Sequence, residues 1–293
     1  MLAHAKKEGY AVGYFEAFNM DAMLAVLSAA EQVNSPVIIG FGGQFLSSRK
    51  RTAAEDIYLY GAVALEAAKR SKVPTTVMLN EADHLPMIFE GMQAGFNAVM
   101  YQKQGEDFQE TRRITRELCE AAHDLGIDVE SEVGDLPMAD ISSGTCTAGE
   151  KTDPGIALEF AEYTGIDALA VAIGNVHLLE DGKSNLDFEL LRYLNAQSPV
   201  PLVMHGGTGV SDEEMKKAVS LGIVKVNVGT ALKRAYINAV GRFYLDMDVS
   251  KVDPHVTIGW GGEEDMLSCG RAAIAEKVLE YIDLFGSANR VPG

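Results

Sequence analysis

The sequence predicts a single (β/α)8 barrel of the TIM type with a C-terminal helical extension, and three observations lead to this fold class. Short apolar or β-branched runs alternate with segments of helical apolar spacing along the whole chain. Glycine ends several of the helical segments just before the next apolar run. No Pro/Ser-rich linker divides the 293 residues. We therefore expect one domain over residues 1–293, because eight such units in roughly 250 residues match a closed barrel.

Eight runs are predicted to be parallel strands, since each is followed by enough residues for a right-handed helical crossover. They are Ala11 to Phe15, Pro36 to Gly40, Pro74 to Leu79, Asn97 to Met100, Asp128 to Val133, Ala168 to Ala172, Pro201 to Met204 and Lys225 to Val228.

The helices between these strands have recognisable boundaries. Apolar spacing predicts helices over residues 21–30 and 108–125. Ser211 with Glu214 forms a capping-box pattern that predicts a helix start. Helix ends are predicted at four glycines: Gly222, which ends the helix that starts at Ser211, and Gly95, Gly126 and Gly165.

Composition excludes several classes of protein. The net charge is 25 − 42 = −17, so the chain lacks the basic surface that non-specific nucleic-acid binding requires. No apolar run approaches the ~18 residues that span a bilayer, and the first residues have no signal-peptide core. The three cysteines, Cys119, Cys146 and Cys269, cannot build a disulfide framework. We expect a cytoplasmic protein that binds neither nucleic acid nor membranes.

Polar residues gather just past the predicted strands, where a β/α barrel has its active site. They are Asn80 and Glu81 after the third strand, Glu130 and Glu132 at the end of the fifth, His177 after the sixth, His205 after the seventh, and Asn227 to Thr230 after the eighth.

Two histidines in this set indicate a metal site. One histidine at a strand end is usually structural, but His177 and His205 follow adjacent strands, with Glu81 across the mouth. Two imidazoles and a carboxylate leave an open position for a substrate oxygen, as catalytic zinc sites do. The sequence therefore predicts that Glu81, His177 and His205 bind a divalent ion.

Two glycine-threonine segments predict a phosphate site. They follow the seventh and eighth strands, where barrels commonly hold phosphate, and the second opens a helix. Glycine lets backbone N–H groups approach an anion, and threonine adds a hydroxyl. The predicted substrate-binding residues are Gly206, Gly207, Thr208, Asn227, Val228, Gly229 and Thr230.

The motifs of the chain, taken together, resemble those of the metal-dependent (class II) aldolases that cleave fructose or tagatose 1,6-bisphosphate. The likeness covers almost the whole chain. It is carried by Asn34-Ser-Pro-Val-Ile, Glu130-Ser-Glu-Val-Gly134, Thr152-Asp-Pro, Asp167-Ala-Leu-Ala-Val-Ala-Ile-Gly, Leu186-Asp-Phe-Glu-Leu-Leu, His205-Gly-Gly-Thr-Gly, Lys225-Val-Asn-Val-Gly-Thr and Leu284-Phe-Gly-Ser-Ala288.

The resemblance implies roles for several residues. His177 and His205 match two of the three metal ligands, and zinc is the expected ion. The two glycine-threonine segments match the stretches that hold the dihydroxyacetone-phosphate half of the substrate. Glu132 matches a carboxylate near the metal. Family members are usually dimers or tetramers, so a homodimer or homotetramer is expected.

Departures from the family pattern affect the proton chemistry. Leu79-Asn80-Glu81 replaces Leu-Asp-His, whose aspartate moves a proton and whose histidine binds metal. An amide cannot act as acid or base, so Asn80 would orient the scissile hydroxyl while Glu81 binds metal. A slipped alignment would use Asp83 and His84 instead. Three further positions also differ: Leu178 stands for a glycine, Gln102 for an aspartate, and residues 141–147 for an acidic lid motif.

The sequence thus predicts a metal-dependent aldehyde-lyase that cleaves or forms a phosphorylated ketose through a metal-stabilised enediolate. Glu132, Asp83, His84 or a metal-bound water would carry the proton. A sugar-phosphate isomerase or epimerase, and a non-catalytic sugar-phosphate binding subunit, remain as alternatives. Two features stay open: residues 135–152 are either a mobile lid or an inert excursion, and Arg271 either reaches a distal phosphate or is a surface arginine.

Overall fold

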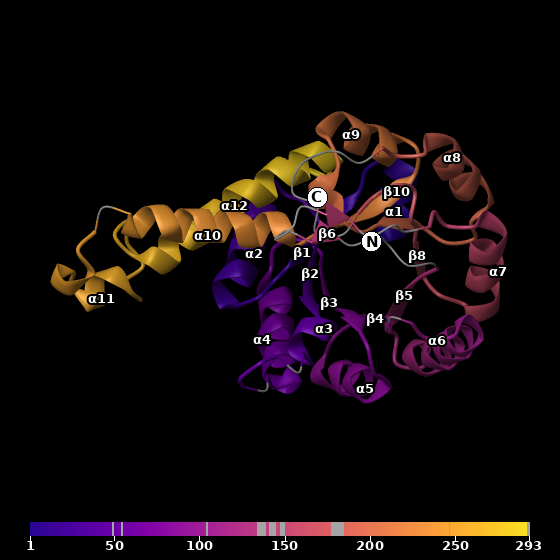
Figure 1. Ribbon diagram of the computed structural model, residues 1–293, viewed down its shortest axis with the longest axis horizontal. Helices are drawn as coiled ribbons and strands as arrows, with labels where there is room; N and C mark the ends of the chain where they lie inside the picture. The colour runs from indigo at the N-terminus through magenta and orange to yellow at the C-terminus, as the bar shows by residue number, and fades with distance from the viewer. Residues whose placement is uncertain are drawn as a thin grey trace.

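The fold is a closed barrel of parallel strands surrounded by helices (Figure 1). The computed structural model describes residues 1–48, 50–53, 55–103, 105–133, 139–140, 145–146, 150–176, 185–245 and 247–291. Neighbouring strands follow the order β1-β10-β9-β8-β5-β4-β3-β2 around the barrel. The barrel strands are β1 (Val12–Glu16), β2 (Val37–Gly42), β3 (Thr75–Ala82), β4 (Ala98–Tyr101), β5 (Asp128–Glu132), β8 (Ala168–Ala170), β9 (Leu202–Met204) and β10 (Ile223–Val228).

The predicted (β/α)8 barrel is confirmed, and each predicted strand overlaps an observed one. The largest difference lies at the end of β3, which continues to Ala82. Within the predicted excursion of residues 135–152, two short strands pair antiparallel, β6 (Ala139–Asp140) and β7 (Thr145–Cys146). Residues 135–138, 141–144 and 147–149 of that excursion lie outside the described residues. Neither the lid prediction nor the inert-excursion prediction is therefore tested.

The helices begin and end largely as the sequence predicts. The Ser211 hydroxyl accepts the Glu214 backbone N–H at 3.4 Å, and all four predicted stop glycines have positive φ. No described helix is long and apolar enough to cross a membrane. The helices are α1 (Leu2–Glu8), α2 (Met20–Gln32), α3 (Gly43–Leu46), α4 (Ile57–Arg70), α5 (Leu85–Ala94), α6 (Phe108–His123), α7 (Pro154–Thr164), α8 (Phe188–Gln197), α9 (Asp212–Ser220), α10 (Thr230–Tyr244), α11 (Pro254–Thr257) and α12 (Met266–Phe285), with 3-10 turns η1 (Gly207–Gly209) and η2 (Val249–Lys251).

Alternation along the strands divides the apolar core into two layers. Phe15, Ile39 and Leu79 point outward and pack under the helices, whereas Tyr14 and Met78 belong to a cluster inside the barrel. Helix α1 packs against this inner cluster and fills the N-terminal end of the barrel. The opposite end, where the strands terminate, is therefore the end available for a site.

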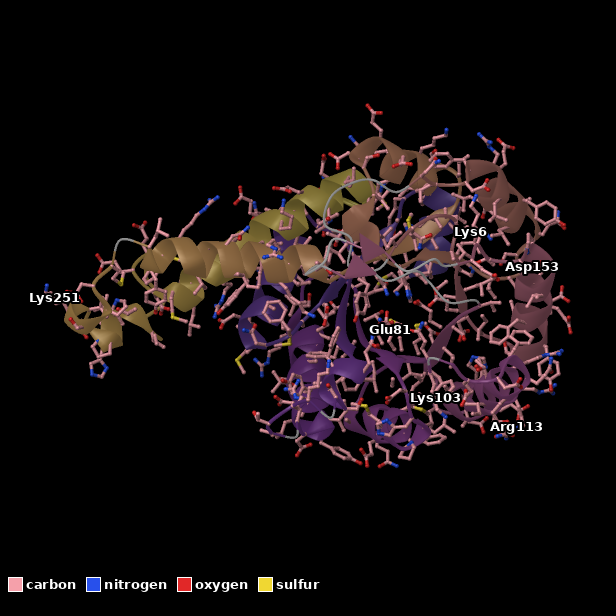
Figure 2. The ribbon with its side chains drawn as sticks, in the orientation of Figure 1. Lys6, Glu81, Lys103, Arg113, Asp153 and Lys251 are labelled. Carbon is pink, nitrogen blue, oxygen red and sulfur yellow. The ribbon has the colours of Figure 1, made fainter. Side chains whose placement is uncertain are left out.

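The C-terminal extension is a helical arm (Figure 1). Helices α10 and α12 run side by side away from the barrel, with α11 near the tip, and Figure 2 shows Lys251 at that tip. Large apolar side chains are exposed along the arm: Ile237, Leu245, Val249, Ile258 and Trp260. The arm therefore presents apolar surface that the described residues of the same chain leave uncovered.

The buried cysteine of α6 is expected to be chemically inert. Burial raises the pKa of the Cys119 thiol to about 12, so only about one molecule in ten thousand carries a thiolate at pH 8. Treatment of the native protein with iodoacetamide at pH 8 should modify the half-buried Cys269 and leave Cys119 unmodified, as peptide mass spectrometry will report. Modification of both at similar rates would contradict the packing of α6.

Candidate active site at the barrel mouth

A backbone irregularity in β3 directs Glu81 into the mouth of the barrel. The register with β4 shifts between Leu79 and Ala82, and Glu81 has φ of 50°, a left-handed conformation that is unusual for a residue other than glycine. The Gln44 amide on α3 donates to the Glu81 carboxylate at 2.5 Å. Figure 2 shows Glu81 near the centre of the barrel. Strained backbone of this kind concentrates at functional sites.

The Glu81 carboxylate faces His205, the residue that follows β9. Glu81 Oε1 is 3.6 Å from His205 Nδ1, and Glu132 Oε2, at the end of β5, is 3.8 Å from the same nitrogen. The imidazole is fully buried. Glu132 also accepts a hydrogen bond of 2.8 Å from the Gln102 amide. Glu81, Glu132 and His205, which the sequence placed separately on the rim, therefore lie together.

The other face of His205 is held by a buried ionic network. Its Nε2 lies 3.0 Å from Glu130 Oε1, and Glu130 Oε2 is 2.9 Å from Lys225 Nζ. Lys225 also donates to Asn227 Oδ1 at 2.6 Å. Glu130 and Lys225 are both nearly inaccessible to solvent. A buried carboxylate between an ammonium and an imidazole fixes the ring orientation, with Nδ1 turned toward Glu81.

The charges of this network shift the pKa of each member. Burial alone would raise the pKa of Glu130, but the Lys225 ammonium and the His205 hydrogen bond lower it. Burial alone would lower the pKa of His205, and the hydrogen bond to Glu130 with the nearby Glu132 and Glu81 raises it. Burial lowers the pKa of Lys225, against the opposing effect of Glu130.

Two buried asparagine side chains have hydrogen-bonding capacity left over. The Asn80 side chain is hydrogen-bonded to the Tyr14 hydroxyl, yet its Oδ1 has no partner among the described residues. The Asn227 Oδ1 is used by Lys225, and its Nδ2 likewise has no described partner. Buried polar groups are normally paired, so one acceptor and one donor are available to a ligand.

The two glycine-threonine segments meet at the start of α10. The Thr208 hydroxyl accepts the Ala231 backbone N–H at 3.3 Å, which joins the turn after β9 to the first turn of α10. Gly206 has φ of 68°, a conformation that favours glycine. Gly229 is the N-cap residue of α10, and as a glycine it has no side chain that could cap the helix. Uncapped N–H groups at a helix start attract anions.

An ion pair that was not predicted from the sequence lies on the β1 side of the mouth. Glu16 ends β1, and its Oε1 is 2.7 Å from Lys233 Nζ on α10. The ammonium lies 4.2 Å from the centre of the Phe45 ring on α3. Burial raises the pKa of Glu16, whereas Lys233 lowers it. The sequence predicted a role for neither Glu16 nor Gln44, because neither lies in a recognisable motif. For Glu16, the signal that was available is a charged residue at the end of a barrel strand.

The remaining sequence candidates have different surroundings. His177 and Leu178 lie outside the described residues. Within the part of the chain that is described, no three His, Cys, Asp or Glu side chains form a complete metal-binding group. Asp83 and His84 bond each other, and both side chains are about half exposed, so the geometry favours Glu81 over this pair. Arg271 is bonded to Asp21 on α2.

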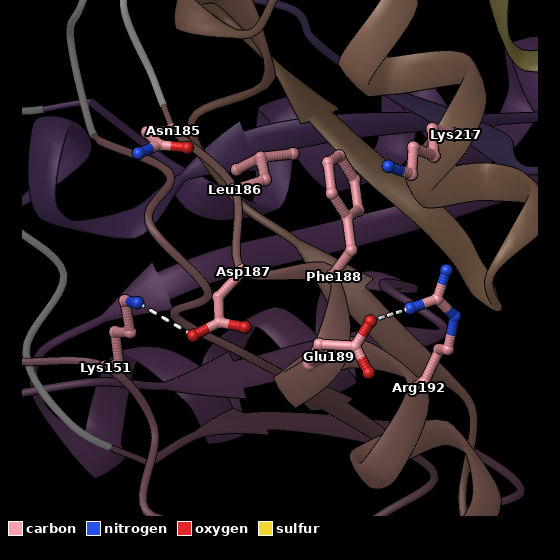
Figure 3. A pocket seen from close by; sticks show the side chains of 8 residues that line it. All are labelled: Lys151, Asn185, Leu186, Asp187, Phe188, Glu189, Arg192 and Lys217. Atoms are coloured by element: carbon pink, nitrogen blue, oxygen red, sulfur yellow. Dashed lines mark hydrogen bonds and ion pairs between the residues drawn. The ribbon is translucent and has the colours of Figure 1, made fainter.

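A shallow hollow of about 390 Å³ lies at the start of α8, apart from the residues above (Figure 3). Two of its cations already face carboxylates: Lys151 is 2.8 Å from Asp187, and Arg192 is bonded to Glu189. The hollow contains none of the predicted site residues, although the motif that begins at Leu186 lines part of it.

Comparison with known proteins gives one consistent result. The family model described as class II fructose-bisphosphate aldolase matches residues 1–290. The sulfofructosephosphate aldolase of Alkalicoccus urumqiensis is 33% identical, covering 99% of this chain and 96% of that protein. The probable fructose-bisphosphate aldolase of Bacillus subtilis is 33% identical, with 99% and 96% covered. The crystal structure of the YdjI aldolase of Escherichia coli K12 superposes with a TM-score of 0.81 at 31% identity, over 99% of this chain and 97% of that one.

Proposed function

The chain belongs to the class II fructose-bisphosphate aldolase family as an aldolase-like lyase, and we propose that it cleaves or forms a ketose that carries a phosphate on its dihydroxyacetone half. The observation that carries this proposal is the meeting of Glu81, His205 and Glu132 at the mouth, with Glu81 in a strained left-handed conformation.

We propose that Glu81, His205 and His177 hold the divalent ion on which this family depends, with zinc as the expected metal. The 3.6 Å between Glu81 Oε1 and His205 Nδ1 exceeds a hydrogen bond. It lies near the roughly 3.4 Å expected for nitrogen and oxygen ligands on one tetrahedral zinc ion. The chemistry of these two donors therefore fits the ion. When bound, it would polarise the substrate carbonyl and stabilise the enediolate.

The protein's own groups perform the remaining steps. The phosphate binds to Gly206, Gly207 and Thr208 and to the start of α10 at Gly229 and Thr230. Asn227 Nδ2 donates to a substrate oxygen, beside the end of β10 at Val228. Asn80 Oδ1 accepts the hydroxyl on the carbon whose bond breaks and orients it. Glu132, buried within 3.8 Å of His205, carries the proton.

The decisive experiment is a cleavage assay in which a coupled dehydrogenase reduces the dihydroxyacetone phosphate as it is released. A ketose that carries a phosphate on its dihydroxyacetone half, such as a ketose 1-phosphate, should release it. Chelation with EDTA should abolish the release, and a divalent ion should restore it. Solvent deuterium entering intact sugar phosphate without fragmentation would identify an isomerase instead. Protein that binds sugar phosphate but neither cleaves nor exchanges it would identify a binding subunit.

We further propose that residues 1–293 act as one domain in a cytoplasmic homodimer or homotetramer, formed through the helical arm. The support is the apolar surface that the arm exposes, with Trp260 72% exposed near its tip. Trp260→Lys combined with Ile258→Lys should lower the oligomer's mass in light scattering. Tyr193→Lys on α8, an apolar position of the barrel as exposed as Ile258, is the control. Unchanged assembly in the arm variant would refute the arm as the interface.

A further inference from the structure

Glu16 occupies the part of the mouth between the phosphate cradle and the metal donors. A Cβ built on Gly229, at the end of β10, would lie 2.4 Å from Glu16 Oε2, and one on Gly42, at the end of β2, would lie 3.5 Å from Oε1. The Glu16 side chain is only 12% exposed. These approaches locate the carboxylate over the ends of β1, β2 and β10, and a side chain at position 229 would displace it.

The expected position of the scissile carbon–carbon bond places the aldehyde half of the substrate near Glu16. Tyr14 and Glu16 are two residues apart in β1, so their side chains point to the same inner face, with Glu16 nearer the mouth. The Tyr14 hydroxyl is hydrogen-bonded to Asn80. A ketose with its phosphate at α10 and its scissile hydroxyl on Asn80 therefore extends its aldehyde half along the ends of β1 and β2.

Among the described residues named here, the charges along this path are carboxylates or cations that already pair with one. The Glu16 and Glu81 carboxylates both raise the pKa of the Tyr14 hydroxyl, so both negative charges act at the inner end of β1. Lys233 is committed to Glu16 at 2.7 Å. Arg271, the candidate for a distal phosphate, is committed to Asp21. A second phosphate here would have to compete with Glu16 for Lys233 and lie against a carboxylate.

We infer that the aldehyde half of the substrate is uncharged, so that the enzyme works on ketose monophosphates, and that Glu16 is the residue that rejects a phosphorylated aldehyde. This rests on the proposed aldolase function and specifies its substrate class. In the condensation direction, C3 of dihydroxyacetone phosphate loses a proton and bonds to the aldehyde carbon, whose oxygen gains a proton. No other reactant is needed.

The test uses dihydroxyacetone phosphate with two achiral aldehydes, glycolaldehyde and glycolaldehyde phosphate, so that stereochemical preference does not enter. Product formation by the metal-loaded wild-type enzyme is followed by mass spectrometry. We expect kcat/KM for glycolaldehyde to exceed that for its phosphate by about tenfold or more, since like charges in close contact oppose binding. Equal use, or a preference for the phosphate, overturns the inference while leaving the aldolase function intact. No product with either aldehyde overturns both.

Variants of Glu16 test whether this residue sets the preference for the unphosphorylated aldehyde. Glu16→Gln, which removes the charge and releases Lys233, should raise kcat/KM for glycolaldehyde phosphate relative to glycolaldehyde by about tenfold. Glu16→Asp, which keeps the charge, should retain the wild-type preference. Glu66→Gln, an exposed matched change on α4, should leave the ratio unaltered. A Glu16→Gln enzyme that is folded, active on glycolaldehyde and unchanged in its ratio would show that Glu16 does not set specificity.

Discussion

Glu81→Gln is expected to abolish metal-dependent cleavage and to weaken divalent-ion binding by at least about 100-fold, more than the loss of an outer hydrogen-bond partner causes. The amide keeps the size of the side chain and its place beside Gln44, but it removes the anionic ligand that faces His205 at 3.6 Å. Calorimetric titration of metal-free protein with zinc will measure the affinity, independently of activity.

Two further variants make the Glu81 result specific. Glu90→Gln, an exposed change on α5, should leave metal affinity unchanged. Glu81→His should restore tight zinc binding, because histidine is among the residues enriched in the left-handed backbone region that this position occupies. If Glu81→Gln binds zinc as tightly as the wild type, the metal ligand in β3 is not Glu81, and the Asp83 and His84 pair becomes the next candidate.

Lys225→Met is expected to lower the free energy of unfolding by about 3–5 kcal/mol, as breaking a buried ion pair does. The change leaves the Glu130 carboxylate inside the barrel without the ammonium that lies 2.9 Å away, and Asn227 loses a hydrogen bond of 2.6 Å. Equilibrium unfolding in urea will measure the loss. Lys251→Met, which removes an 81% exposed side chain from a surface ion pair on the arm, should change the stability by no more than about 0.5 kcal/mol.

A double variant separates charge from packing in the same network. Adding Glu130→Gln to Lys225→Met removes the uncompensated buried carboxylate, so the double variant should be more stable than Lys225→Met alone. It should still bind zinc less tightly than the wild type, by about 10–100-fold, because His205 loses the carboxylate that orients it. Additive destabilisation in the double variant would rule out electrostatic coupling between Glu130 and Lys225.

Much of the fold could be predicted because its signals are local. A strand such as β2 (Val37–Gly42) is buried along its whole length, and such strands are continuous apolar runs in the sequence. Gly95 and Gly165 end their helices in left-handed conformations that other residues adopt at a cost. The predicted end of β3 at Leu79 was short of the observed Ala82, because the bulge at Asn80 and Glu81 depends on a partner strand that the local sequence does not specify.

The sequence by itself determined the barrel, the family and the set of polar residues at the strand ends, because periodicity, glycine stops and motifs are properties of short segments. Only the tertiary structure decided which of those residues meet. Glu81 faces His205 from the far side of the barrel, Gln44 restrains Glu81, and Lys233 reaches Glu16 across 217 positions of chain. Such contacts depend on barrel closure and side-chain direction, so charge pairing at the mouth follows from three-dimensional packing rather than from spacing along the sequence.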